Sequence, residues 1–307
     1  MKFWVGVTDN AWFNFLSRSA PDEVNFWQPR GATAYAGLEP GALFLFKLKR
    51  PYHHIAGGGY FVKSTSLPLS IAWEAFGHKN GAVQKSEFEK MIRNLLIEST
   101  ARDPEIGCTV LTQPFFWPQE AWISDPIDFT INIVRGRYYD TAEPSGANLW
   151  TEVRSRLTER PSEPLRVSEP EPQERHGTPR LVRPRLGQGA FRVLVTDAYQ
   201  RHCALTGEST LPVLEAAHIQ PYAENGPHDP ANGILLRSDF HKLFDIGLVT
   251  VTPDYHIEVS ARIREEWFNG KAYYRLHGQQ LSLLPEHPAH RPDAVFLRWH
   301  NENRYVG

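Results

Sequence analysis

The stretch of sequence that decides the fold runs Leu214-Glu215-Ala216-Ala217-His218-Ile219-Gln220-Pro221, then Asn232-Gly233-Ile234-Leu235-Leu236, then Asp239-Phe240-His241-Lys242-Leu243-Phe244-Asp245. Its pattern of apolar and polar residues predicts a strand, a loop, a second strand and a helix. His241 and Asp245 are four residues apart, so they share one face of that helix and can bind one cation. His218 ends the first predicted strand, where its imidazole can face the cation. The spacing therefore predicts a metal-dependent site that hydrolyses phosphodiester bonds.

Chemistry suggests a role for each residue of this site. A neutral His218 can take a proton from water, which makes it the predicted general base. Asn232 is predicted to hold the loop and to orient His218 through backbone contacts; with His218 and His241 it forms the predicted catalytic set. His241 and Asp245 are the predicted metal ligands. So few protein ligands, one of them a carboxylate, favour Mg²⁺ or Mn²⁺ over tightly bound zinc.

The segments Leu-Glu-Ala-Ala-His-Ile-x-Pro and Phe-His-Lys-Leu-Phe-Asp resemble the ββα-metal HNH nucleases, and the resemblance spans about residues 187–305. It implies a ββα-metal fold and a DNA-cleaving activity. Colicin-type members carry a second histidine as a metal ligand just before the general base, where this chain has Ala217. Glu215, two residues further upstream, is therefore a candidate helper at the metal.

Two further expectations concern the surroundings of this site. Many HNH nucleases bind a structural zinc ion through paired Cys-x-x-Cys motifs. This region contains Cys203 alone, so we expect no structural zinc and a buried, apolar position for Cys203. The neighbouring histidines have no partner at a useful spacing and are expected to be surface residues: His202, His228 and His256.

Length and composition set limits on the whole chain. It has 307 residues, enough for two domains, with 41% hydrophobic and 22% charged residues. Two cysteines fit a reducing cytoplasm, and no apolar run is long enough for a signal peptide or a membrane span. The net charge of −2 predicts weak binding to bulk DNA. A DNA-binding protein of this charge must recognise something particular, or use a local patch such as Arg175, Arg180, Arg183 and Arg185.

The predicted domains are 1–157 and 187–307, joined by a linker over 158–186. The linker is rich in proline and charge and has no aromatic residue, which predicts an extended spacer. The N-terminal domain is predicted to be a small mixed β-barrel with helices, and the fold class of the chain is therefore α+β. The apolar runs that predict its strands are 3–7, 42–48, 60–62 and 129–134, and helical spacing occurs over 11–18 and 86–98.

Aromatic residues are concentrated in the N-terminal domain, where seven of the nine tryptophans lie before residue 151. For any single tryptophan, filling the core is the favoured interpretation. The functional alternative is a cage that stacks a flipped base between aromatic faces while polar neighbours bind its edge. The predicted modified-base-binding residues are Asp9, Asn10, Trp12, Asn25, Trp27 and Gln28.

The segments Phe-Trp-Val-Gly-Val-Thr-Asp-Asn-x-Trp, Asn-Phe-Trp-Gln-Pro and Gly-Gly-Gly-Tyr-Phe-Val resemble EVE-type, PUA-like domains that are fused to HNH nucleases. The resemblance covers most of residues 1–150 and implies the binding of modified bases in nucleic acid. Together the two resemblances imply a bacterial, cytoplasmic, type IV-like restriction endonuclease. The resemblance does not identify the modification. Our hypothesis for the substrate is double-stranded DNA containing a modified cytosine, of the 5-methyl or 5-hydroxymethyl type.

Three points remain open at this stage. Double-strand cleavage with one active site per chain predicts a homodimer, although no segment marks an interface. One alternative function is an HNH nicking or homing-type nuclease that reads sequence or RNA. The other is a protein that binds modified nucleic acid without cleaving it.

Overall fold

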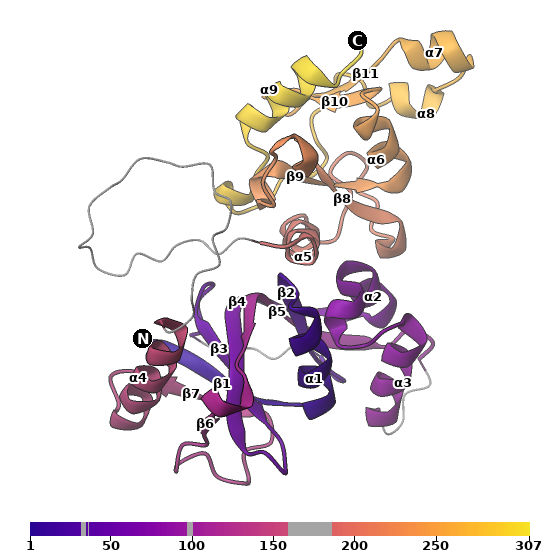
Figure 1. The fold of residues 1–307 in the computed structure, drawn as a ribbon. Helices are drawn as coiled ribbons and strands as arrows, with labels where there is room; N and C mark the ends of the chain where they lie inside the picture. The colour runs from indigo at the N-terminus through magenta and orange to yellow at the C-terminus, as the bar shows by residue number, and fades with distance from the viewer. Residues whose placement is uncertain (32–34, 36, 97–100, 159–185) are drawn as a thin grey trace, which may run out of the picture. The chain divides into compact units, whose positions relative to one another are not determined.

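The computed structural model describes residues 1–31, 35, 37–96, 101–158 and 186–307. The chain divides between Arg185 and Leu186 into two compact units (Figure 1). The predicted linker, apart from its end residues 158 and 186, and the predicted arginine patch lie outside the described residues. No described helix is long and apolar enough to cross a membrane.

The N-terminal unit is built on a mixed seven-stranded sheet in the order β2–β5–β4–β3–β1–β7, with β6 paired to β4. β1 and β3 are parallel, and the other neighbouring strands are antiparallel. The strands are β1 (Lys2–Thr8), β2 (Glu23–Gln28), β3 (Leu43–Leu48), β4 (His54–Pro68), β5 (Glu105–Phe116), β6 (Ile123–Ser124) and β7 (Gly136–Asp140). The helices are α1 (Asn10–Ser19), α2 (Leu69–Phe76), α3 (Lys85–Leu95) and α4 (Pro144–Thr158).

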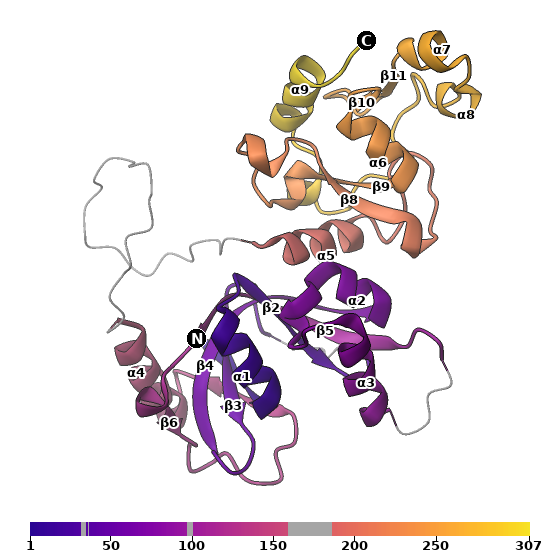
Figure 2. The same cartoon turned by 45° about the vertical axis from the view of Figure 1, so that its right-hand side comes forward.

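Alternating side chains give this sheet two apolar faces, because neighbouring residues of a strand point to opposite sides. Phe44 and Phe46 of β3 pack in one cluster with Trp12 and Leu16 of α1. Leu43 and Leu45 pack in a second cluster, to which α4 contributes Leu149 and Val153. α1 and α4 therefore cover opposite faces of the sheet, and the two ribbon views separate them (Figures 1 and 2).

The predicted barrel is not closed. Among the described residues the sheet ends at β2 and β7, which do not pair. The segment that follows α2 lies against β2 instead: the Trp27 Nε1–H donates to the Asn80 carbonyl at 2.8 Å, and Asn25 Nδ2 donates to Asn80 Oδ1 at 2.9 Å. These contacts hold the segment that follows α2 against the side chains of β2.

The strand predicted over 129–134 is wrong, because that segment forms turns and β7 begins after it. Two turn hydrogen bonds hold it, from Phe129 N to Pro126 O and from Ile133 N to Thr130 O. Strands β2 and β5 were not predicted. Both are buried on both faces for much of their length, so their sequences lack the alternation that marks a strand with one exposed face.

In the C-terminal unit, the predicted order of strand, loop, strand and helix is confirmed. β8 (Leu214–His218) pairs antiparallel with β9 (Gly233–Arg237), and α6 (Ser238–Asp245) follows β9 directly. The apolar spacing of Phe191, Leu194, Val195 and Tyr199 predicts a helix over 188–201, and in the structure this helix ends at Ala198. The other elements are α5 (Gln188–Ala198), β10 (Val249–Val251), β11 (Ile257–Val259), α7 (Arg262–Trp267), α8 (Lys271–Tyr274) and α9 (Ala294–Asn303).

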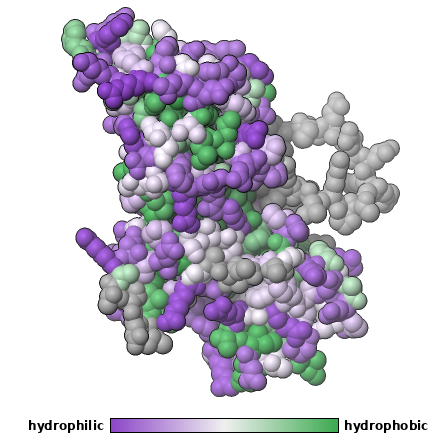
Figure 3. All heavy atoms as spheres, turned by 180° about the vertical axis from the view of Figure 1, so that it is seen from behind, coloured by the Kyte–Doolittle hydropathy of each residue, from purple (hydrophilic) through white to green (hydrophobic). Residues whose placement is uncertain are grey.

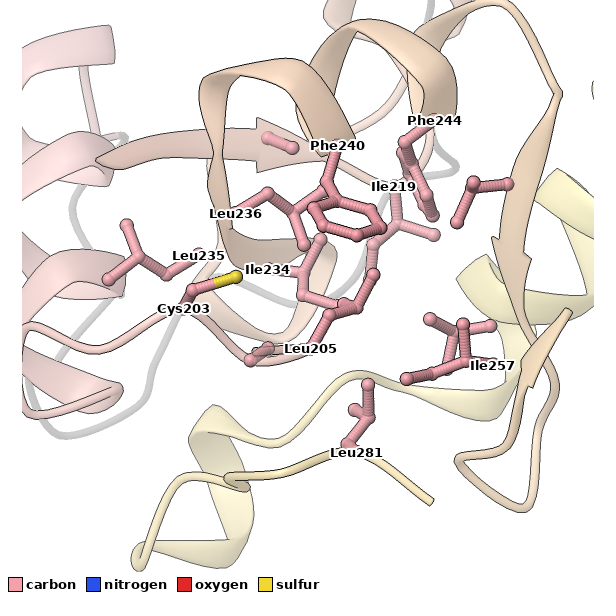
Figure 4. Packing of buried hydrophobic residues seen from close by; sticks show 14 of the residues in the cluster. Cys203, Leu205, Ile219, Ile234, Leu235, Leu236, Phe240, Phe244, Ile257 and Leu281 are labelled. Atoms are coloured by element: carbon pink, nitrogen blue, oxygen red, sulfur yellow. The ribbon is translucent and has the colours of Figure 1, made fainter. Parts of the chain in front are cut away.

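One apolar core holds these elements together (Figure 4). Phe240 and Phe244 project from α6 onto Ile234 and its neighbours in β9. Cys203 is buried in this core, as predicted, and its sulfur accepts a hydrogen bond from Arg237 N. On the face that Figure 3 shows, hydrophobic residues reach the surface in patches between hydrophilic ones. The core therefore fixes the hairpin and α6, which carry the predicted catalytic residues.

Candidate functional site

The β8–β9 hairpin determines which residues surround His218. His218 pairs with Gly233 at the loop end of the hairpin, so the loop that joins them leaves and returns at the same place. Asn232 is buried, and its side chain holds this loop together through hydrogen bonds. Its side chain accepts from Gln220 N at 2.9 Å and donates to Gln220 O at 2.9 Å and Pro227 O at 3.0 Å.

The His218 imidazole is held between two rings. Phe191 of α5 stacks on it with the ring centroids 3.8 Å apart and the planes 11° apart. His228 Nδ1 lies 2.9 Å from His218 Nε2. Burial, and then the charges of His228 and His241, lower the pKa of His218 to about 4. A histidine with so low a pKa is neutral at pH 7 and can accept a proton.

His228 is the functional residue that sequence analysis missed, since it was expected to be a surface residue. In the structure it is half-buried, and Tyr222 stacks on its other side at 4.4 Å. Its spacing from His218 follows no helical or strand period. Topology could have placed it. His228 belongs to the loop that joins two paired strands, and such a loop begins and ends beside His218.

His241 lies between two carboxylates on α6 and β8. Its Nδ1 is 2.5 Å from Glu215 Oε2, and its Nε2 is 3.4 Å from Asp245 Oδ2. The predicted metal ligands His241 and Asp245 are therefore adjacent, as their spacing requires. Glu215, expected to help at the metal, contacts the other nitrogen of His241 instead.

This donor set fits a divalent cation. A metal-binding histidine usually donates its second ring N–H to a carboxylate, and Glu215 is placed to accept that hydrogen bond from Nδ1. Two ligands at right angles around Mg²⁺, each about 2.1 Å away, stand about 3 Å apart, close to the 3.4 Å between His241 Nε2 and Asp245 Oδ2. No group of three or more metal-binding side chains occurs among the described residues. Mg²⁺ can bind with only two protein ligands, because it keeps several waters and binds substrate phosphates.

In the N-terminal unit, four of the six predicted base-binding residues line one cavity of about 540 Å³: Asp9, Trp12, Trp27 and Gln28. The volume is within the range of small-molecule sites, about 300–1,000 Å³. Three cations also line it, Arg30, Lys49 and Arg135. Asp9 also caps α1 and pairs with Lys49 at 3.2 Å.

The other two predicted residues lie outside the lining of this cavity. Asn10 binds the backbone at Lys49 N and Arg50 O, which ties the start of α1 to the end of β3. Asn25 is fully buried, and its amide donates to Asn80 and to Cys108. Both side chains thus have structural contacts.

Comparison with known families places an HNH endonuclease domain in this chain: residues 203–252 match the HNH endonuclease family. The match contains His218, Asn232, His241 and Asp245. Comparison with curated proteins gave no match.

Two solved structures show limited similarity. ASCH from Zymomonas mobilis is 10% identical with a TM-score of 0.31, over 50% of this chain and 94% of its own. A structure described as a modification-dependent TagI restriction endonuclease is 13% identical with a TM-score of 0.28, over 96% of this chain and 80% of its own. Scores this low assign neither a fold nor a function to the chain.

Proposed function

We propose that this protein is a divalent-metal-dependent DNA endonuclease that cleaves DNA containing a modified cytosine. The observation that carries the proposal is the arrangement around α6 of the HNH domain. A neutral histidine, His218, ends β8, and the His241–Asp245 pair, oriented by Glu215, stands on the helix that follows β9. This set combines a base with a cation site, which phosphodiester hydrolysis requires.

The proposed mechanism assigns one task to each residue. His218 takes a proton from the attacking water at Nδ1, while His228 accepts the Nε2–H of His218 and so fixes that tautomer. The water oxygen bonds to phosphorus, and the bond to the 3′ oxygen breaks. A cation held by His241 and Asp245 would stabilise the charge that develops on the phosphate and the leaving oxygen. Asn232 keeps the loop closed around His218.

Reading of the modified base is proposed for the N-terminal unit, in line with its resemblance to EVE-type, PUA-like domains. The cavity supports this, because Trp12 and Trp27 line it, and Arg30, Lys49 and Arg135 in the same lining could contact flanking phosphates. The near-neutral charge of the chain favours such recognition. Cleavage of both strands further suggests a homodimer.

Matched substrates test this function. The protein is incubated with Mg²⁺ or Mn²⁺ and with duplexes that differ only in carrying cytosine, 5-methylcytosine or 5-hydroxymethylcytosine. We expect both strands of a modified duplex to be cut in preference to the unmodified one. Equal cutting of all three would refute the reader role, and cleavage of one strand alone would favour a nicking nuclease. Binding without cleavage under either metal would indicate a pure binding protein.

Trp27→Ala is expected to weaken binding to modified DNA by about 1–3 kcal/mol, because base–aromatic stacking is worth about that much. Trp27 also packs edge-on against Phe88 and donates to Asn80, so its stability must be measured in parallel. Trp27→Phe is the matched control, since it keeps an aromatic face and loses the hydrogen bond to Asn80. Titration of modified and unmodified duplexes measures the effect. If both duplexes lose the same affinity, Trp27 does not read the modification.

His228→Phe is expected to lower kcat about tenfold or more, as part of the 10²–10⁴-fold that a general base contributes. The variant keeps a ring to stack on Tyr222 but removes the acceptor for His218 Nε2–H. His228→Asn should recover much of the rate, because its Oδ1 stands near the position of Nδ1. Single-turnover cleavage at saturating enzyme measures both. A His228→Phe enzyme as fast as the parent would remove His228 from the mechanism.

A further inference from the structure

A groove of about 520 Å³ lies on the C-terminal unit between α7 and α8, outside the HNH match at 203–252. The two helices lie side by side at one end of this unit in both ribbon views (Figures 1 and 2). The Tyr274 hydroxyl joins them, since it donates to Ser260 O and accepts from Arg264 N at the start of α7. The groove is lined by Arg264, Phe268, Asn269, Lys271, Tyr274 and Arg275.

Three cations gather in the groove without compensating charge. Arg264, Lys271 and Arg275 are exposed, and none of them forms an ion pair with a carboxylate among the described residues. By contrast, Arg262 on the same helix pairs with Glu266, four residues later and outside the groove lining. The groove is therefore a local positive site on a chain whose net charge is −2.

Phe268 gives the groove an aromatic edge at a conformational cost. It ends α7 in the left-handed region, with φ at 53°, which is uncommon for a bulky residue and costs about 1–2 kcal/mol. Its side chain is 90% exposed, so packing within the unit does not offset that cost. Glycine is the usual residue at such a helix end. An exposed aromatic ring held in this way indicates a contact with a ligand.

We propose that this groove binds the sugar–phosphate backbone of the DNA substrate, with phosphates on Arg264, Lys271 and Arg275 and a sugar or base against Phe268. Charge complementarity selects this occupant, since a polyanion satisfies the three cations together. Tyr273 of α8 packs edge-on against Phe240 of α6 at 5.3 Å, which anchors the groove to the helix that carries His241. The inference rests on the proposed function only in taking DNA as the substrate.

The test compares two arginines of the same helix in the full chain. Arg264→Ala removes a groove cation, and Arg262→Ala removes an ion-paired cation outside it. Both are made in a His218→Ala background and titrated with a labelled duplex in Mg²⁺ at several salt concentrations. The slope of log Kd against log salt concentration reports the number of phosphate contacts. Arg264→Ala, Lys271→Ala and Arg275→Ala should each lower that slope by roughly the amount due to one contact, and the triple variant by roughly the amount due to three. Arg262→Ala should leave it unchanged.

The duplexes carry either cytosine or 5-hydroxymethylcytosine, because a backbone contact ignores base modification. The groove variants should lose the same factor of affinity for both duplexes. Phe268→Ala should also weaken the binding of both duplexes. Equal behaviour of Arg264→Ala and Arg262→Ala, or a loss confined to modified DNA, would overturn the proposal. Failure of the proposed function gives another result: the parent protein cleaves no duplex, while the groove variants still bind DNA more weakly.

Discussion

His218→Ala is expected to lower kcat for DNA cleavage by about 10²–10⁴-fold, which is the usual contribution of a general base. We expect this loss because His218 has the properties of a general base: its pKa is lowered to about 4, and its ring is held in place by Phe191 and His228. His228 does not replace it in the proposed mechanism, because His228 contacts His218 Nε2 and not the attacking water. Single-turnover cleavage of modified DNA at saturating enzyme measures the loss.

Two controls separate catalysis from folding. His202→Ala removes an exposed histidine of the same unit and should leave cleavage unchanged. The His218→Ala protein should also keep its melting temperature to within a few degrees and its affinity for DNA and Mn²⁺. Cleavage by His218→Ala within about tenfold of the parent rate would exclude the base role.

His241→Ala and Asp245→Ala are each expected to lower cleavage at least about a hundredfold, because a bound cation contributes several kcal/mol and each 1.4 kcal/mol is about tenfold. Glu215→Gln should lower metal affinity by about 10–100-fold, since it replaces the carboxylate that orients His241 with a neutral amide. High Mn²⁺ should therefore restore much of the rate of Glu215→Gln but little of the rate of the ligand variants.

Metal affinity can be measured apart from activity, by titrating Mn²⁺ and following its free signal by electron paramagnetic resonance. Lys242→Ala is the matched control, because it is an exposed residue of α6 adjacent to His241 in the chain. It should bind Mn²⁺ as the parent does. Unchanged Mn²⁺ affinity in His241→Ala and in Asp245→Ala would show that the cation binds elsewhere.

Much of the candidate active site could be predicted from the sequence because it is local. A hairpin followed at once by a helix brings His218, Asn232, His241 and Asp245 together through contacts between near neighbours in the chain. The position of His228 could not be predicted, because it depends on the irregular loop that Asn232 holds. Phe191 could be assigned to the apolar face of a helix, but its stacking on His218 depends on how that helix packs.

The N-terminal unit was harder to predict, for a physical reason. Its sheet is covered on both faces, so aromatic residues point both into the core and toward the cavity without a pattern that separates them. Trp12 shows the consequence: it packs between Phe26 and Phe46 and also lines the cavity. Asn25 was predicted beside a base because its neighbours are aromatic, yet it is buried against Asn80.

The central claim is that the HNH domain hydrolyses DNA through His218 and a cation at His241 and Asp245. Analysis of the ends of cleaved 5-hydroxymethylcytosine DNA, with Mg²⁺ and with chelator, tests it most directly. We expect Mg²⁺-dependent products with 3′ hydroxyl and 5′ phosphate ends, which disappear with His218→Ala. Products that form equally in chelator, or that His218→Ala forms at the parent rate, would contradict it.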